Sequence, residues 1–351
     1  MNDASANEVL DEGLTRLAAT GPEFRGGLSN HGPMAAEAMV RLGRADAVEG
    51  WLDGYLRRLD GPPAPSDRIC DETWRESLGA SNRVADWQQY FHDQLAEDPW
   101  RDVLARWWPR LLPGLAAAST HGVIRTSHAA RSLAAAEQAG AGTAERTDEL
   151  GRGLAYWAAR YLELPGRPRT EGRLDLAAAV GGLPVATSEP AAGLIFETLK
   201  VGLADQPGFA SAVAALRGPT DVSADLAALA REFARVFLVY GRTRPIALLH
   251  AVTAPVAARS VLPLLPAEVA RPTYDALWQV GAALYTVYTG GTTPEPLPVG
   301  PPPSADELAD RAVATGDVHA VKLAEACLRL DAVTPDPLLH HAAARAAELL
   351  G

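Results

Sequence analysis

Histidines are the residues of this sequence best suited to bind a metal ion, and the chain contains eight of them. His250 lies among apolar residues in ALLHAVTAPVAA, His319 lies in DVHAVKLAEACLRL, and His31 lies in SNHGPM. For any single histidine, a hydrogen-bonded core position is the simpler interpretation. When several helices each bring a histidine inward, every buried ring needs a polar partner, and one shared metal ion satisfies all of them. We therefore predict a single catalytic metal ion inside a helical bundle.

Two further histidines, His121 and His128, lie seven residues apart on one face of a predicted helix. Their Cα atoms are then ~10.5 Å apart, too far for one ion without a stretched geometry. His121 falls in the first turn, where the positive end of the helix dipole opposes a cation. We predict that His128 is a ligand, and that His121 and Arg125 bind a substrate oxygen or handle a proton.

The remaining histidines are predicted to lie outside the metal site. His92 follows the polar run DWQQYFHDQ and is expected at the surface. His340 and His341 are neighbours and cannot face the same way on a helix. His340 falls on an apolar stripe and is expected in the core.

Lysine is rare in this chain, because only Lys200 and Lys322 occur among 32 basic residues. Burial can deprotonate an amine, whereas a guanidinium stays charged. Lys322 shares a helix face with His319, and a neutral amine there could add carbon dioxide to give a carbamate. Imidazoles and one such oxygen donor suit a first-row metal such as Fe(II). The alternative is a lysine paired with an acid such as Glu325 or Asp310.

The composition favours helices as the elements that position these residues. Hydrophobic residues make up 48% of the 351 residues and aromatic residues only 6%. Alanine and leucine dominate, and they favour helix over strand. We predict an all-α fold in which a single multi-helix domain spans residues 1–351 and surrounds an inward-facing histidine site.

Hydrophobic periodicity predicts where the helices lie. The predicted ranges are 4–19, 33–44, 46–59, 82–96, 100–117, 120–139, 145–163, 189–203, 222–240, 245–263, 267–288, 304–315, 318–330 and 336–350. Pro33 and Pro245 suit first helical turns, and Thr120 and Asp317 suit helix caps. Loops are expected at 61–68 and 165–172, with a proline-rich connector at 290–303 before the last three helices.

Several classes of protein are excluded or disfavoured by the sequence. The net charge of −11 argues against nucleic-acid binding, which needs a basic face. Cys70 and Cys327 form no disulfide or metal motif, and GxGxxG, GxxxxGK[ST], HExxH and GxSxG do not occur. The amino terminus lacks the pattern of a secretion signal, and no apolar run approaches the ~20 residues that span a bilayer. We therefore expect a cytoplasmic protein without a membrane partner.

Four segments of the chain resemble the questin oxidase-like family in their order and spacing. They are SNHGPM, PRLLPGLAAASTHGVIRTSHAARSL, LLHAVTAP and DVHAVKLAEACL, and the resemblance covers roughly residues 8–350. It implies one of two activities. The first is a non-haem iron oxygenase whose ligands are His31, His128, His250, His319 and a carboxylated Lys322. The second is a metal-independent, flavin-free, NADPH-assisted Baeyer–Villiger monooxygenase.

The first activity agrees with the residues and is the function that we predict. Dioxygen and an aromatic polyketide or quinone-like substrate of secondary metabolism would react by oxygen insertion or ring cleavage. Trp107, Trp157, Tyr161 and Trp278 could line the substrate pocket, although aromatic residues at helical spacing are more often core. The Baeyer–Villiger enzyme with NADPH is the second hypothesis, and a non-enzymatic helical scaffold is the third. A homodimer stays an open alternative.

Overall fold

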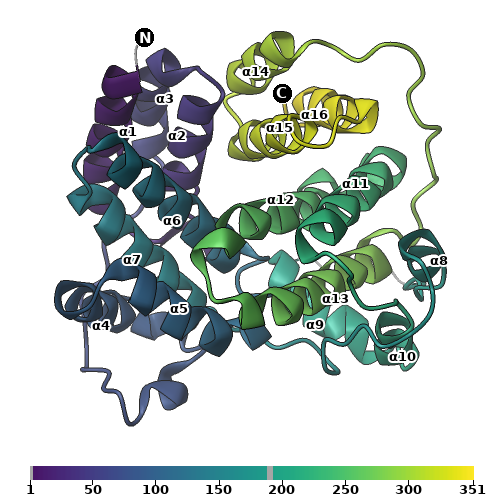
Figure 1. The fold of residues 1–351 in the computed structure, drawn as a ribbon, viewed down its shortest axis with the longest axis horizontal. Coiled ribbons are helices and arrows are strands. Elements are labelled where there is room, and N and C mark those ends of the chain that lie inside the picture. Colours follow the sequence, from purple (N-terminus) through teal and green to yellow (C-terminus); the bar gives the residue numbers. More distant parts are fainter. Residues whose placement is uncertain (1–2, 188–192) are drawn as a thin grey trace. The chain divides into compact units, whose positions relative to one another are not determined.

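The computed structural model describes residues 3–187 and 193–351, and it divides the chain into two compact units. Unit 1 comprises Met1–Leu162 with Pro263–Leu265, and unit 2 comprises Glu163–Leu262 with Pro266–Gly351. The prediction of an all-α fold is confirmed, because the described residues form helices and one hairpin of two short strands (Figure 1). A single domain over 1–351 stays a prediction.

Unit 1 is built around one buried helix, α6. Its helices are α1 (Asp3–Ala18), α2 (Gly32–Arg41), α3 (Val48–Leu56), α4 (Val84–Glu97), α5 (Trp100–Leu111), α6 (His121–Ala139) and α7 (Ala144–Ala159). The strands β1 (Glu23–Phe24) and β2 (Leu28–Ser29) pair antiparallel just before α2. Helix α6 packs against α2 and α7. The approach of α7 requires Gly122, because a Cβ atom there would lie 2.7 Å from the Trp157 side chain.

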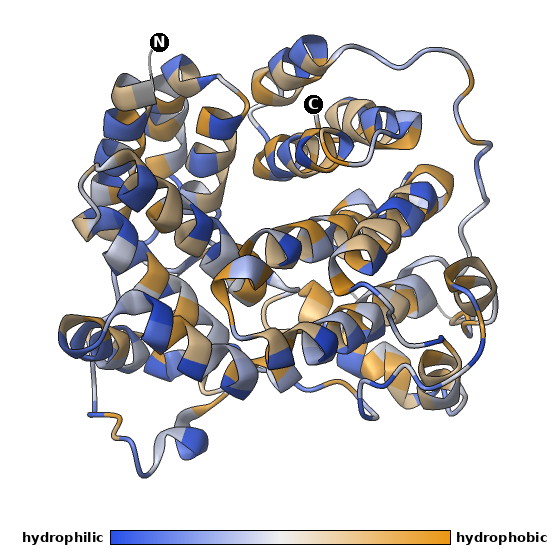
Figure 2. Cartoon of the chain, viewed as in Figure 1, coloured by the Kyte–Doolittle hydropathy of each residue, from blue (hydrophilic) through white to orange (hydrophobic). Residues whose placement is uncertain are grey.

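Unit 2 is built around α12 and α13. Its helices are α8 (Leu176–Gly181), α9 (Ile195–Ala204), α10 (Phe209–Ala214), α11 (Val222–Tyr240), α12 (Pro245–Val261), α13 (Ala270–Tyr288), α14 (Ala305–Ala314), α15 (Val318–Asp331) and α16 (Pro337–Leu350). Helix α12 is packed by α11, α13 and α15, and residues 247–258 are all buried. In both units, hydrophilic and hydrophobic residues alternate along the outer helices, as expected for amphipathic packing (Figure 2).

Most predicted helices and loops are confirmed, including the bounds of α11 at 222–240. The loops at 61–68, 165–172 and 290–303 carry no helix or strand. The prediction missed α8 and α10, because six residues hold too little periodicity to reveal a helix. Of the predicted helix 189–203, residues 189–192 lie outside the described residues, and the rest overlaps α9, which ends one residue later at Ala204.

The predicted start signals are confirmed at three of four helices. Pro33 and Pro245 lie in the first turns of α2 and α12. The Asp317 side chain accepts hydrogen bonds from the amides of His319 and Ala320 and so caps α15. Thr120 precedes α6, but the prediction that it caps the helix is wrong. Thr120 occupies the cap position in a left-handed conformation, with a φ of 70°, and its side chain forms no capping hydrogen bond.

One helix corrects the expectation that no apolar run approaches the length of a membrane span. The segment Pro245–Leu264 is long and apolar enough to cross a membrane. Most of it is buried inside the protein, and buried core helices pass the same test. The length and composition of this helix are therefore weak evidence for a membrane span, and the location of the protein stays a prediction.

Candidate metal centre

In unit 2, the packing of α12 against α15 brings His250 and His319 together. Their ring centroids lie 5.7 Å apart and the ring planes meet at 77°. Both residues are buried. The sequence predicted that these two histidines meet, and the structure brings them together.

A backbone carbonyl fixes which nitrogen of His250 carries the proton. The Nδ1 atom lies 2.5 Å from the carbonyl oxygen of Ile246, one helical turn earlier. A carbonyl only accepts, so Nδ1–H donates and the lone pair is on Nε2. Burial, together with the positive charges of Lys322 and His319, holds the pKa of His250 well below its usual value. The ring is therefore neutral, which is the form that binds a metal ion.

His319 is oriented by the residue that caps its helix. Its amide donates to Asp317 Oδ1 at 2.7 Å, and the same oxygen lies 3.4 Å from His319 Nδ1. Burial lowers the pKa of His319 even though Asp317 acts in the opposite direction. The carboxylate thus lies on the Nδ1 side of the ring and adds negative charge next to the imidazole.

Lys322 lies one turn after His319 and is almost completely buried, with 1% of its surface exposed. Burial lowers its pKa from 10.5 to about 7. Its Nζ atom has no hydrogen-bond partner among residues 3–187 and 193–351. The alternative partner Glu325 accepts instead from Arg329 at 2.7 Å. The amine is therefore buried and has a pKa near neutral pH, as a carbamate site requires.

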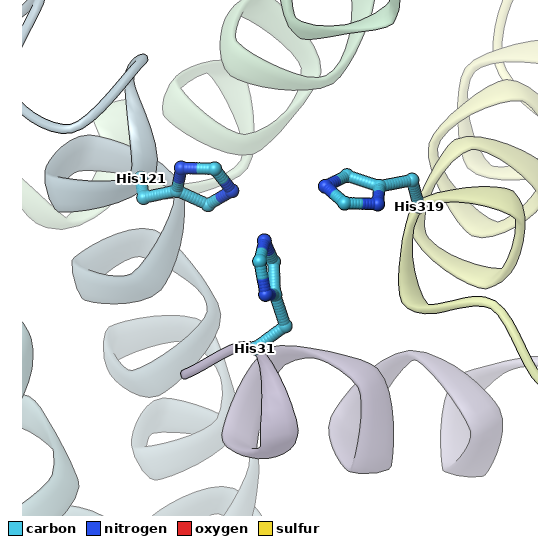
Figure 3. A group of neighbouring side chains, drawn as sticks. All are labelled: His31, His121 and His319. Atoms are coloured by element: carbon cyan, nitrogen blue, oxygen red, sulfur yellow. The ribbon is translucent and has the colours of Figure 1, made fainter. Parts of the chain in front are cut away.

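In unit 1, the structure brings His31 together with His121. Their ring centroids lie 4.5 Å apart, and the rings meet edge to face at 84° (Figure 3). His31 occupies the position just before α2, and His121 is the first residue of α6. The Nδ1–H of His121 donates to the carbonyl oxygen of Ala118, which leaves the lone pair on Nε2.

A strained turn sets the carbonyl that holds His121. Ala118, Ser119 and Thr120 all have positive φ angles, of 44°, 60° and 70°. Residues other than glycine rarely adopt this left-handed region, and a β-branched residue such as threonine least of all. Each such residue costs on the order of 1–3 kcal/mol, and strain of this kind concentrates at functional sites. Three residues with left-handed φ angles therefore stand directly before the buried His121.

His128 does not take the place that the sequence predicted beside His31. It lies two turns further along α6, where its Nδ1 is 2.9 Å from Glu37 Oε2. Burial alone would raise the pKa of Glu37, but Arg131 and His128 hold it well below its usual value. The sequence predicts His128 in the cluster and His121 as its neighbour, whereas the structure places His121 beside His31 and His128 beside Glu37. Metal binding by His128 itself stays a prediction.

Arg125 is already paired with an acid. Its Nε and Nη2 atoms donate to the two oxygens of Glu149 at 2.6 and 2.7 Å, and both side chains are buried. Burial would lower the pKa of Arg125, but Glu149 outweighs it and raises the pKa. Only Nη1 has no hydrogen-bond partner within the described ranges. That Arg125 binds a substrate oxygen stays a prediction, and Nη1 is the atom that would donate the hydrogen bond.

The other residues selected from the sequence lie elsewhere. His92 is exposed, as predicted. His340 is only partly buried and bonds Pro303 and Asp331, so the prediction that it is a core residue was only partly right. The proposed pocket walls Trp107, Trp157 and Trp278 are fully buried, whereas Tyr161 is half-buried. The three tryptophans are packed as core residues, and the prediction that the four side chains line a substrate pocket stays a prediction.

Sequence reasoning missed Glu37 and Glu149, the acids that organise the buried charges of unit 1. Glu37 lies in the apolar run GPMAAEAMV, and an isolated acid in such a run could have signalled a buried ion pair. Glu149 lies in a polar segment, which carries no such signal. The sequence also did not reveal that the hydroxyl of Tyr55 accepts a hydrogen bond from the amide of His31.

Buried histidines that could hold a metal ion thus occur in both units. They are His31 and His121 in unit 1 and His319 in unit 2, where His319 projects from the first turn of α15 (Figure 3). The chain matches no protein family and no curated protein sequence with which it was compared. The resemblance to the questin oxidase-like family therefore stays a prediction.

Proposed function

We propose that this protein is a metal-dependent oxygenase and that His250, His319 and Lys322 hold a catalytic non-haem iron ion. The observation that carries the proposal is the surroundings of Lys322. A buried amine whose pKa is about 7 lies one turn from a neutral imidazole and close enough to lower the pKa of a second one. Burying an amine costs desolvation free energy unless a partner such as a metal ion compensates it.

The chemistry of these donors fits a first-row metal ion. A protonated ammonium would repel a cation, whereas the neutral amine can attack carbon dioxide. The new N–C bond gives a carbamate, and the lost proton passes to solvent. The product carries the charge and the two oxygens of a carboxylate. Two imidazole nitrogens and such an oxygen donor suit a borderline metal ion such as iron.

The side chains of the cluster would hold and orient the ion, and the apolar helix α12 would keep water away. When bound, the ion supplies a site at which dioxygen can be activated. The Ile246 carbonyl keeps the His250 ring in the tautomer that presents Nε2, and the Asp317 carboxylate lies near Nδ1 of His319. Two further imidazoles, His31 and His121, are present in unit 1. That His31 binds the same ion as His250 and His319 stays a prediction.

The substrate class rests on the resemblance of the four sequence segments. It implies an aromatic polyketide or quinone-like compound that undergoes oxygen insertion or ring cleavage. Dioxygen would be the co-substrate. The alternative is the metal-independent Baeyer–Villiger enzyme that uses NADPH, and the third hypothesis is a scaffold without activity. Metal content and metal-free activity distinguish these hypotheses.

Metal analysis of protein purified without added metal tests the proposal. We expect about one iron per chain, and replacement of His250 or His319 by alanine should remove it. His92→Ala, which changes an exposed histidine of the same chain, should leave the metal content unchanged. If both His250→Ala and His319→Ala keep the iron content of the parent, the proposed site is refuted. Full activity in metal-free protein would favour the Baeyer–Villiger alternative.

The lysine variants test the carbamate. Lys322→Arg keeps a positive charge but cannot add carbon dioxide, so metal affinity should fall. With ¹³C-labelled bicarbonate, the parent protein should show a carbamate carbon signal that this variant lacks. Lys200→Arg is the matched control, because Lys200 is the other lysine of the chain and is exposed. If Lys322→Arg binds metal as well as the parent does, the lysine is not a ligand.

A further inference from the structure

The residue just before helix α2 is a histidine whose side chain takes no part in capping the helix. His31 occupies the cap position, where serine, threonine, aspartate or asparagine usually binds the first amides. Its imidazole forms no capping hydrogen bond and faces His121 instead (Figure 3). The amides at the start of α2 still need acceptors, because they are buried.

Other residues supply these acceptors. The amide of His31 donates to the hydroxyl oxygen of Tyr55 at 2.8 Å, and the amide of Gly32 donates to Asn30 Oδ1 at 3.0 Å. Pro33, the next residue, has no amide hydrogen. In a capping box, a glutamate or glutamine at the third helical position accepts from the amide of the cap residue. Met34 stands at that position and cannot do so.

Tyr55 is itself held firmly on α3. Its ring stacks on Trp51 with centroids 4.7 Å apart, and the guanidinium carbon of Arg58 lies 5.6 Å from the ring centroid. Tyr55 is buried, and the packing of its ring keeps the hydroxyl oxygen in place as an acceptor for the amide of His31.

We infer that Tyr55 is a positioning residue for His31. Its hydroxyl caps α2 in place of the histidine side chain and leaves the imidazole turned toward His121. The value of this arrangement for metal binding rests on the proposed function, in which His31 is a predicted ligand. The ring contact in unit 1 stands independently of any metal.

Tyr55→Phe tests the inference, because it removes only the hydroxyl and keeps the packing of the ring. In metal-free protein with ¹³C-labelled histidine, the parent should show a nuclear Overhauser contact between the His31 and His121 rings. The variant should lose or weaken this contact, and the amide hydrogen of His31 should exchange faster. Tyr90→Phe is the control, because Tyr90 is another buried tyrosine of unit 1 whose hydroxyl donates to Asp71.

Titration with Co²⁺ provides the second measurement. We expect Tyr55→Phe to weaken Co²⁺ binding about 10-fold and to change the visible spectrum of the bound ion, whereas Tyr90→Phe should change neither. Both variants should lower the melting temperature, so stability alone does not decide. If Tyr55→Phe is less stable but keeps the ring contact and the Co²⁺ affinity, the inference is overturned.

The metal role of His31 is tested separately with His31→Asn. If this variant binds Co²⁺ as tightly as the parent does, His31 is not a ligand. That result would overturn the prediction that His31 is a metal ligand. The His31–His121 ring contact measured in Tyr55→Phe would still test whether Tyr55 positions His31.

Discussion

The two histidine clusters are built by different physical means. In unit 2, His250, His319 and Lys322 lie in an apolar environment, and burial is the first cause of the lowered pKa of each. In unit 1, the helix that carries His121 is lined by buried ion pairs and hydrogen bonds. Desolvation is thus the main influence on protonation in the unit 2 cluster, whereas buried ion pairs line the helix that carries the unit 1 histidine.

The largest expected effect concerns the pH dependence of stability in unit 2. The folded-state pKa of Lys322 is about 7 and its ordinary value is 10.5, so between these values the unfolded chain binds more protons. Stability therefore rises with pH in this window as the cost of the buried ammonium disappears. Relative to Lys322→Met, the parent should gain about 4 kcal/mol from pH 7 to pH 10.

Denaturant unfolding of both proteins across this range, in buffer depleted of metal and carbon dioxide, measures the gain. Lys200→Met is the control and should follow the parent at every pH. If the free energy of unfolding depends on pH in the same way in the parent and in Lys322→Met, burial does not lower the pKa of Lys322.

A smaller but still large effect is expected from Glu37 in unit 1. Glu37→Gln keeps the shape of the side chain but leaves Arg131 buried without its counter-charge, and His128 without its carboxylate. The free energy of unfolding should fall by about 3 kcal/mol. Glu307→Gln breaks the exposed pair with Arg311 and should cost less than about 1 kcal/mol. Equal losses in the two variants would show that the buried ion pair does not organise unit 1.

The cap of α15 is expected to contribute less. Asp317→Ala removes the acceptor of two amides and should lower stability by about 1 kcal/mol, whereas Asp317→Asn keeps a good cap. Both variants remove the carboxylate beside His319 and should weaken metal binding. Chemical unfolding should therefore show lower stability for Asp317→Ala than for Asp317→Asn. Co²⁺ titration should show weakened metal binding in both variants. Full Co²⁺ affinity in Asp317→Asn would show that the carboxylate does not orient His319.

The smallest effect is expected at the strained turn of unit 1. Thr120→Gly relieves a φ of 70° but gives the unfolded chain more freedom, so stability should be unchanged or rise by up to about 1 kcal/mol. Thr147→Gly lies inside α7 and should instead cost about 1 kcal/mol. Thermal unfolding compares the two. A similar loss in both would mean that the left-handed turn stores no strain at Thr120.

Local pattern in the sequence was sufficient to predict the helices and part of the candidate site. The bounds of α11 and the cap at Asp317 could be predicted because periodicity and capping involve neighbouring residues. His319 and Lys322 are one turn apart on one helix, so their proximity was also predictable. The apolar neighbours of His250 predicted its burial.

Which histidine of α6 meets His31 depends on how the helices pack. His121 and His128 lie on the same helix face, and the choice between them depends on where α2 docks along α6. The same docking places Glu37 beside His128, and the packing of α3 places the hydroxyl of Tyr55 at the start of α2. Contacts between residues far apart in the chain leave no periodic signal. Local pattern therefore predicted the burial of residues in apolar helices, such as His250, whereas the buried acids and the pairs of side chains that meet depend on long-range packing.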